Sequence, residues 1–315
     1  MRKLLLFTVL TLLIGGATAL AMTIEEALAL FQGSDIMIPY SDEGRATLEE
    51  AIAAFQAALG VTVDLDEGNE ADVMAFEVDI ALLDVVSKLS QCYYTLADAF
   101  LEGDPEERPT YLRGKHWGLL CLRTDETFAA TEAADGFVAA VATSDDVAGL
   151  YWTAANWLRA AEFNPLEAVF AGVPEKTDTI NRRCLELDET YMSYGSYRAL
   201  GAFWAGLPKL PAGTYRKNWN RSLGYFCKIV NEPGICAECS DCPDFGEFLP
   251  EMDAYFENRL LFVQYWLIEK GGYWEEAKRI LEAVLAEPIG ELYPLYNAIS
   301  QEKAVAFLAE VEEHL

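Results

Sequence analysis

The sequence predicts an all-α protein, built as a tetratricopeptide-like array of helical hairpins (an α-solenoid) without a significant sheet. Apolar residues recur at three- and four-residue steps along most of the chain, which is the spacing of one helix face. Segments of roughly 12 to 20 residues with this pattern are separated by turns that carry glycine or proline. No segment has a reliable strand pattern. A compact helical bundle is the structural alternative, because the repeats are too degenerate to set a period.

The first 21 residues have the composition of a secretory signal peptide. A basic start at residues 2–3 precedes an apolar run from Leu4 to Ile14, and Ala19 and Ala21 supply a cleavage site. A retained anchor is the alternative, although the apolar run is short for a spanning helix. We expect residues 22–315 to form a single helical-repeat domain that does not span a membrane once the signal is removed.

The N-terminal half predicts a series of helices. TIEEALALFQ forms a short helix, and residues 41–60 form a longer one that ends at Gly60, a usual helix stop. The segment VTVDLDEGNEAD predicts a loop, and a long helix is predicted from Ala71 to Leu101. Asp104 and Pro105 close that helix and cap the next one, whose core reads YLRGKHWGLLCL.

The stretch from Leu150 to Pro208 is rich in aromatic residues and organises the middle of the chain. A helix is predicted to begin near Ser144, and another begins where an N-cap, a first-turn proline and an acidic cap follow one another, at Asn164, Pro165 and Glu167. A third long helix places three aromatic residues and a glycine on one side: Tyr194, Tyr197, Gly201 and Trp204.

The C-terminal part begins with an amphipathic helix near Trp219. A loop rich in cysteine and proline follows at about residues 232–250. Two helices are predicted after it, from about Met252 to Glu269 and from Tyr273 to Ala286, and a last helix ends the chain.

The chain is strongly acidic, with 23 basic and 51 acidic residues and a formal net charge of −28. Removal of the predicted signal peptide takes away two basic residues and makes the net charge −30. Such a field repels phosphate groups, so we expect no binding to nucleic acid. Acidic side chains also keep an exported protein in solution, and a docking patch for a basic partner is the alternative.

Few residues are available for catalysis. The two histidines are His116 and His314, and no nucleophile elbow accompanies them. The sequence has neither a GxxxxGK[ST] loop nor a strand-linked GxGxxG. Carboxylates are too abundant to single out a catalytic pair of the glycosidase type, which composition leaves open. We therefore expect no enzymatic activity and no cofactor.

The cysteine-rich loop carries C-x2-C-x2-C spacing, which is found in metal sites. The ferredoxin pattern needs a further cysteine three residues on, which is missing here, so a fourth ligand would be Cys227 or His116. In an oxidising compartment disulfides are the usual fate of such thiols, and we expect a disulfide-stapled loop, with a structural metal or unpaired thiols as alternatives. The residues of this loop pattern are Cys227, Cys236, Cys239 and Cys242. The remaining cysteines are predicted to be core residues: Cys92, Cys121 and Cys184.

The aromatic residues of the central stretch are the strongest indication of a binding site. Helical repeats often leave such side chains along a concave groove, although ordinary packing between helices is the alternative. Arg198 could pair with a ligand carboxylate. The candidate groove residues are Tyr151, Trp152, Asn156, Trp157, Tyr194, Tyr197, Arg198 and Trp204.

Five stretches carry a resemblance to a known family: LSQCYYTLADAF, DPEERPTYLRGKHWGL, LYWTAANWLRA, CLELDETYMSYGSYRALGAFWAGLP and LYNAISQEKAVAFLAEVEEHL. In that order they resemble the T component (TatT) of tripartite ATP-independent periplasmic (TRAP) transporters. The resemblance covers about residues 83–315 apart from the cysteine-rich insert, and none of its motifs is catalytic.

The resemblance implies an accessory protein of solute uptake. Members are all-helical periplasmic proteins that associate with the solute-binding P component and assist delivery of a hydrophobic or organic-acid ligand to the permease. We therefore expect binding to a P component, to a small organic or hydrophobic ligand, or to both, and homo-oligomerisation is left open. A helical-repeat scaffold in the cell envelope without a small-molecule ligand is the alternative. Members are commonly lipoproteins, whereas this chain has no cysteine near the predicted cleavage site, so we expect a periplasmic protein without a lipid anchor.

Overall fold

The computed structural model describes residues 21–211, 213–240 and 248–315 of the chain. The predicted signal peptide, apart from Ala21, and Cys242 lie outside these ranges. Among the described residues no helix combines the length and the apolar character that crossing a bilayer requires.

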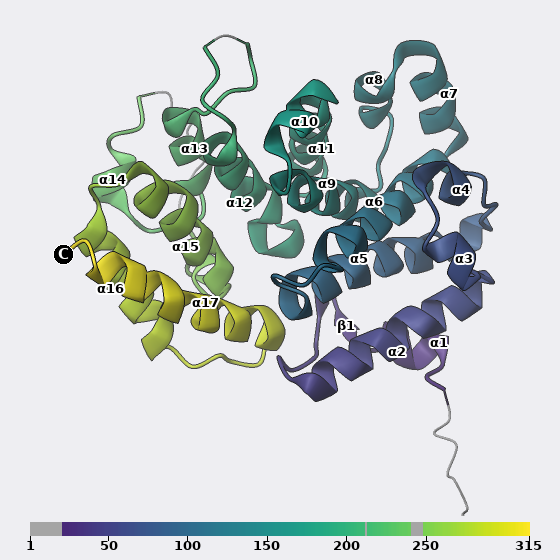
Figure 1. Ribbon diagram of the computed structural model, residues 1–315, viewed down its shortest axis with the longest axis horizontal. Coiled ribbons are helices and arrows are strands. Elements are labelled where there is room, and N and C mark those ends of the chain that lie inside the picture. The colour runs from purple at the N-terminus through teal and green to yellow at the C-terminus, as the bar shows by residue number, and fades with distance from the viewer. Residues whose placement is uncertain (1–20, 212, 241–247) are drawn as a thin grey trace, which may run out of the picture.

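The N-terminal half consists of helices and one two-stranded hairpin (Figure 1). Side-chain caps start several of the helices, for example Ser41 at α2 and Asn164 at α10. The elements are α1 (Ile24–Leu28), β1 (Phe31–Gln32), β2 (Asp35–Ile36), α2 (Asp42–Leu59), α3 (Val63–Asp66), α4 (Glu70–Met74), η1 (Ile80–Leu82), α5 (Leu83–Phe100), α6 (Glu107–Arg123), α7 (Glu126–Asp135), α8 (Phe137–Val141), α9 (Val147–Glu162), α10 (Pro165–Phe170) and α11 (Val173–Leu187).

The C-terminal half is also helical, and it contains one π-helix, η3. Its elements are α12 (Tyr191–Gly206), α13 (Trp219–Phe226), α14 (Pro233–Cys236), η2 (Pro250–Met252), α15 (Phe256–Phe262), η3 (Val263–Ile268), α16 (Trp274–Ala286) and α17 (Pro294–Glu312). The predicted all-α class is confirmed.

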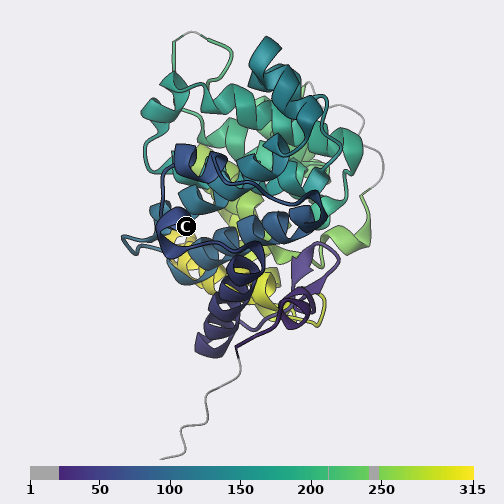
Figure 2. The ribbon, with the colours of Figure 1, turned by 90° about the vertical axis from the view of Figure 1, so that its right-hand side faces the viewer.

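Consecutive long helices pack as hairpins. Helix α5 contacts α6, α6 contacts α9, and α9 contacts α11, while α12 pairs with α13 and α16 with α17. Figures 1 and 2 show that α17 (yellow) returns to the N-terminal half beside α5. A buried hydrogen bond of 3.0 Å between the Thr95 and Tyr296 hydroxyls joins these two helices. The array is therefore curved, and its last helix meets its first hairpins.

Two large apolar clusters form the core. One gathers residues from α1 to α9 and from α11, with Met192 and Tyr255, together with Leu295, Tyr296 and Ile299 of α17. The other gathers residues of α12, α13, α15, η3 and α16 with Ala304 and Val311 of α17. Helix α17 thus buries its beginning in the N-terminal cluster and its end in the C-terminal one.

Some expected element boundaries are wrong. The helix expected over TIEEALALFQ ends at Leu28, and residues 31–36 form a small antiparallel β-hairpin in which Phe31 pairs with Ile36. The expected loop at residues 61–72 contains α3 and the start of α4, because Thr62 and Asn69 cap these short helices. The expected helix from Ala71 to Leu101 is interrupted after α4 and resumes at η1, where the Asp79 carboxylate accepts a hydrogen bond from the Ala81 amide at 2.9 Å.

Helix α12 opens with a left-handed turn. Met192, Ser193 and Tyr194 have φ of 51°, 51° and 65°, a region that costs a non-glycine residue about 1–2 kcal/mol. The turn is held from outside, because Arg198 donates to the carbonyls of Met192 and Ser193, and the Met192 amide donates to Ser34 Oγ at 3.3 Å. Three consecutive residues of this kind mark a place where the surrounding structure imposes the backbone conformation.

Ser193→Gly is expected to raise the free energy of unfolding by about 0.5–1 kcal/mol. Glycine adopts the left-handed conformation without the steric penalty, and the larger conformational entropy that glycine loses on folding offsets part of this gain. Urea unfolding followed by circular dichroism measures the change. The matched control is Ser196→Gly in the regular part of the same helix, which should lower stability by about 1 kcal/mol. Destabilisation of similar size by both variants would contradict the left-handed turn.

Candidate functional site

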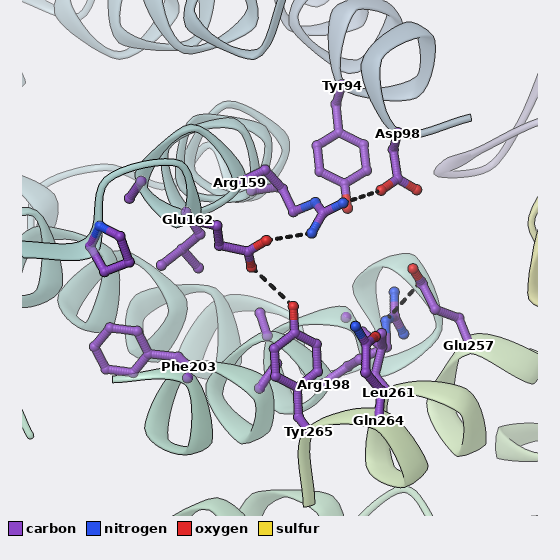
Figure 3. Close-up of a pocket in the computed structure, with 18 of the residues that line it drawn as sticks. Tyr94, Asp98, Arg159, Glu162, Arg198, Phe203, Glu257, Leu261, Gln264 and Tyr265 are labelled. Carbon is purple, nitrogen blue, oxygen red and sulfur yellow. Dashed lines mark hydrogen bonds and ion pairs between the residues drawn. The ribbon is translucent and has the colours of Figure 1, made fainter. Parts of the chain in front are cut away.

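A cavity of about 780 Å³ lies where the two halves of the array meet (Figure 3). Helices α5 and α9–α11 line it from the N-terminal half, and α12, α15, η3 and α17 line it from the C-terminal half. This volume is within the range of small-molecule sites in proteins. The cavity depends on the curvature of the array, because α17 supplies Tyr296, Lys303 and Phe307 to its wall.

One polar group of the wall is centred on Arg159 of α9. Its Nη2 lies 3.1 Å from Asp98 Oδ1, its Nε donates to the Tyr111 hydroxyl at 3.2 Å, and its Nη1 pairs with Glu162. From the opposite side the Tyr265 hydroxyl donates to Glu162 Oε1 at 3.0 Å, so a polar bridge joins α9 to η3 across the cavity (Figure 3).

Asp98 stays charged in this group although it is buried. Burial opposes the charged form, but the positive charges of Lys303, whose Nζ is 3.8 Å away, and of Arg159 outweigh it and lower the pKa of Asp98. The contact between Asp98 and Lys303 also links α5 to α17 at the cavity wall.

A second polar group is centred on Arg198 of α12. Its Nε lies 2.9 Å from Glu257 Oε2, and its Nη1 donates to Asn258 Oδ1 at 2.7 Å. The guanidinium also lies 4.6 Å from the centre of the Tyr255 ring. Burial opposes the charged form of Arg198, but Glu257, followed by Tyr151 and Tyr255, outweighs this effect and holds the pKa of Arg198 well above its usual range. The positive charge of Arg198 is therefore neutralised within the protein.

Aromatic rings form much of the remaining wall. The Trp152 ring lies 5.4 Å from Tyr94 and 5.0 Å from Tyr151, measured between ring centres, and its Nε1 donates to the Tyr191 hydroxyl at 3.1 Å. Tyr151 can approach α12 closely because residue 195 is a glycine: a Cβ there would lie 2.4 Å from the Tyr151 hydroxyl oxygen. The aromatic rings and the polar group of Arg198 therefore line the same cavity.

The π-helix η3 also forms part of the cavity wall. Its wider turn carries Gln264 and Tyr265, and both side chains line the wall together with Leu261 of α15 (Figure 3). π-helical turns occur often at functional sites. The C-terminal half therefore contributes both apolar and hydrogen-bonding groups.

Three of the candidate groove residues line this cavity: Tyr151, Trp152 and Arg198. The other five lie elsewhere. Asn156 is buried between α5, α6 and α9, where its Nδ2 donates to the Trp152 carbonyl at 2.8 Å and to the Ser90 carbonyl at 3.1 Å. The Trp157 ring packs against Phe137.

The remaining candidates pack in the C-terminal half. Tyr194 and Tyr197 belong to its apolar cluster, and the Tyr197 hydroxyl donates to Glu189 Oε2 at 2.7 Å. The Trp204 ring is stacked on Tyr215, with ring centres 5.8 Å apart, and the Arg221 guanidinium lies 3.8 Å from its centre. These contacts are those of packing between helices.

Sequence reasoning missed several wall residues. Tyr94 and Asp98 share one face of α5 at a spacing of four, and Arg159 and Glu162 share one face of α9 at a spacing of three, so a polar face was visible in both helices. The C-terminal contributors carried no such signal, because they are brought in by the fold. They are Tyr255, Glu257, Leu261, Gln264, Tyr265, Tyr296 and Lys303.

The expected disulfide-stapled loop is confirmed for Cys227 and Cys236, whose sulfur atoms are bonded. Cys239 is also disulfide-bonded, so none of these three sulfurs is a thiolate that could bind a metal. Cys92, Cys121 and Cys184 are free and buried, as predicted. His116 lies on α6, where burial, aided by Lys115, lowers its pKa to about 4. In the part of the chain that the structure describes, no three metal-ligating side chains come together.

Comparison with known proteins identifies one family. A family model described as TRAP transporter T-component matches residues 84–220. No curated protein sequence matches the chain. The matched range contains α5, α9 and α12, and with them Tyr94, Arg159 and Arg198 of the cavity wall.

Proposed function

Residues 84–220 belong to the TRAP transporter T-component family, and on this premise we propose that the protein is a periplasmic accessory of a TRAP-type solute uptake system. It binds a small organic or hydrophobic ligand in the central cavity and docks on the solute-binding P component. The observation that carries this proposal is the cavity of about 780 Å³, whose wall is built largely from helices of the matched range.

The composition of the wall supports a ligand site. Apolar side chains such as Leu158, Phe203 and Leu261 cover part of it, and the polar groups of Arg159 and Arg198 are fixed by short contacts within the protein. Ligand sites commonly combine a mostly apolar wall with a few oriented polar groups. The disulfide between Cys227 and Cys236 is in keeping with an oxidising compartment such as the periplasm.

The ligand is tested by filling the cavity. Ala202 lines the wall on α12, and Ala202→Phe should remove bound small molecules from the protein purified from the periplasm, as seen by native mass spectrometry. Ala53→Phe, at an exposed position of α2, is the matched control and should retain them. A protein that carries and binds no small molecule, or an Ala202→Phe variant that binds as well as the control, would contradict the ligand site.

The partner site is proposed on α10. This helix lines the cavity with Pro165 and Ala168, whereas Phe170 on its other side is 89% exposed, next to Leu166 at 55%. A P component that docks on this apolar face lies beside the cavity and shields an exposed patch. The same patch would serve a scaffold without a ligand, which is the alternative function.

Phe170→Asp is expected to weaken binding of the P component at least tenfold, because a charge replaces the centre of the apolar contact. Biolayer interferometry with the purified P component measures this affinity. Val63→Asp, at an apolar position of α3 that is 70% exposed, is the control and should bind normally. Equal affinities of the two variants would place the partner elsewhere.

A further inference from the structure

The cavity wall carries more carboxylates than cations. Among the described residues that line it, the cations are Arg159, Arg198, Lys217 and Lys303, and the carboxylates are Asp98, Glu102, Glu107, Glu162, Glu257 and Glu269. Each of these cations is already in an ion pair with at least one of these carboxylates. An anionic ligand would therefore find no free cation in the described wall and would meet an excess of negative charge.

The excess of carboxylates lies on one side of the cavity, where α5 ends and α6 begins. Elsewhere in the wall the charges are matched one to one, because Arg198 pairs with Glu257 and Lys217 pairs with Glu269. On the side of α5 two cations, Arg159 and Lys303, meet four carboxylates: Asp98, Glu102, Glu107 and Glu162. A positive charge inside the cavity would be attracted to this side.

Glu107, the first residue of α6, is the carboxylate of this group that has no cation. It lines the cavity and is 7% exposed. Its Oε2 accepts a hydrogen bond from the Gly103 amide at 2.8 Å, but its Oε1 makes no hydrogen bond, and the carboxylate makes no ion pair, with any described residue. Oε1 is not among the fully enclosed polar atoms, so another molecule can reach it. Buried carboxylates are normally paired, and the cavity is a place from which the missing cation can come.

An aromatic ring without a cation lies on the same side. Tyr94 is one helical turn before Asp98 on α5, and its ring centre lies 5.4 Å from the ring of Trp152. No cation of the described chain lies over the Tyr94 ring, whereas the neighbouring ring of Tyr111 already carries the Arg159 guanidinium at 5.5 Å. The face of an aromatic ring attracts a cation, and the attraction is stronger where water is excluded.

We infer that the ligand is an organic cation, whose charged amino group has Glu107 as its counter-ion and lies on the side of the cavity that Tyr94 lines. The amino group donates a hydrogen bond to Oε1 of Glu107. This inference rests on the proposed ligand-binding function and narrows it. It assigns the charge of Arg198 to Glu257 and the turn of α12, in place of a ligand carboxylate.

Three probes of equal chain length separate the charge classes: octylammonium, 1-octanol and octanoate. The protein is first freed of co-purified small molecules by dialysis. Isothermal titration calorimetry at pH 7.5 should then give octylammonium a dissociation constant at least about tenfold lower than that of either other probe, because only this probe forms a charge-assisted hydrogen bond with Glu107. This comparison uses the unmodified protein and does not depend on the folding of a variant.

Glu107→Gln tests the counter-ion. The amide keeps the size of the side chain and an oxygen that can accept from the Gly103 amide, but it removes the charge. The variant should bind octylammonium at least about fivefold more weakly and 1-octanol as before. Glu106→Gln is the matched control, because Glu106 is exposed, pairs with Arg113 and lies outside the cavity wall. It changes the net charge equally and should keep the preference for octylammonium.

The possible outcomes separate the inference from the proposed function. Binding of 1-octanol or octanoate as tight as that of octylammonium would overturn the inference and leave the ligand-binding function in place. A preference that survives in Glu107→Gln as fully as in Glu106→Gln would overturn the role of Glu107. A lack of binding by all three probes would overturn the inference as well. The ligand-binding function is decided separately by Ala202→Phe, because the loss of co-purified small molecules does not depend on their charge.

Discussion

Arg198→Met is expected to lower the free energy of unfolding by about 3–5 kcal/mol, because it removes a buried charge and leaves the largely buried carboxylate of Glu257 without its counter-ion. Arg198 is 3% exposed, and Glu257 Oε2 lies 2.9 Å from its Nε. The same change releases the carbonyls of Met192 and Ser193, which Arg198 holds in the left-handed turn. Urea unfolding at pH 7, followed by tryptophan fluorescence, measures the loss.

Two further variants test whether the loss comes from the ion pair between Arg198 and Glu257. Arg45→Met removes an exposed ion pair with Glu49 on α2 and should cost less than about 1 kcal/mol. Glu257→Gln, alone and combined with Arg198→Met, completes a double-mutant cycle with an expected coupling of about 0.5–3 kcal/mol. A loss for Arg198→Met no larger than that of Arg45→Met would contradict the buried pair.

We expect the free energy of unfolding to fall as the pH rises from 5 to 8, and we expect Asp35→Asn to remove most of this fall. Asp35 is 4% exposed in the hairpin, and its Oδ1 has no hydrogen-bond partner. Burial raises the pKa of Asp35 to about 7, against the attraction of Arg198 and Lys88 and with the repulsion of Glu257.

The direction follows from proton binding. In the unfolded chain an aspartate titrates near pH 4, so between about pH 4 and pH 7 the folded protein binds one proton more than the unfolded chain. Stability is therefore lost as the pH rises through this window. From pH 5 to pH 7 the loss is about 2–3 kcal/mol at 1.36 kcal/mol per pH unit.

Urea unfolding at pH 5 and pH 8 tests this expectation. Asp35→Asn should gain about 2–3 kcal/mol relative to the unmodified protein at the higher pH. Glu313→Gln, at an exposed position near the C-terminus, is the matched control and should follow the unmodified protein. Parallel pH curves for Asp35→Asn and the unmodified protein would show that Asp35 is ionised in the folded state at pH 5.

Local patterns predicted the helices well where a cap or a stop residue was present. Gly60 ends α2 in a left-handed conformation, and Asn164 caps α10 by accepting from the Glu167 amide. The hairpin at residues 31–36 could not be predicted, because two residues per strand are too few for an alternation to appear. The left-handed turn of α12 was hidden as well, since Met192 and Ser193 are held by Arg198 and Ser34, and not by their own preference.

The site was predicted in part. The aromatic excess pointed to Tyr151 and Trp152, which line the cavity, and also to Trp204, which is stacked on Tyr215. Helical spacing predicts which residues share one face of a helix, but it does not predict which other elements that face packs against. Glu257 and the other C-terminal wall residues reach the cavity only because the array curves, which local spacing does not encode.

The hydrogen bond between Thr95 and Tyr296 spans 201 positions of the chain. The Thr95 side of this contact can be made only when α17, near the other end of the chain, has also folded, so the N-terminal half exposes apolar surface until then. Contacts of such separation slow folding and leave apolar surface open to unwanted association in the meantime. The closing of this array, which brings α17 against α5, is thus a late step in the folding of each molecule.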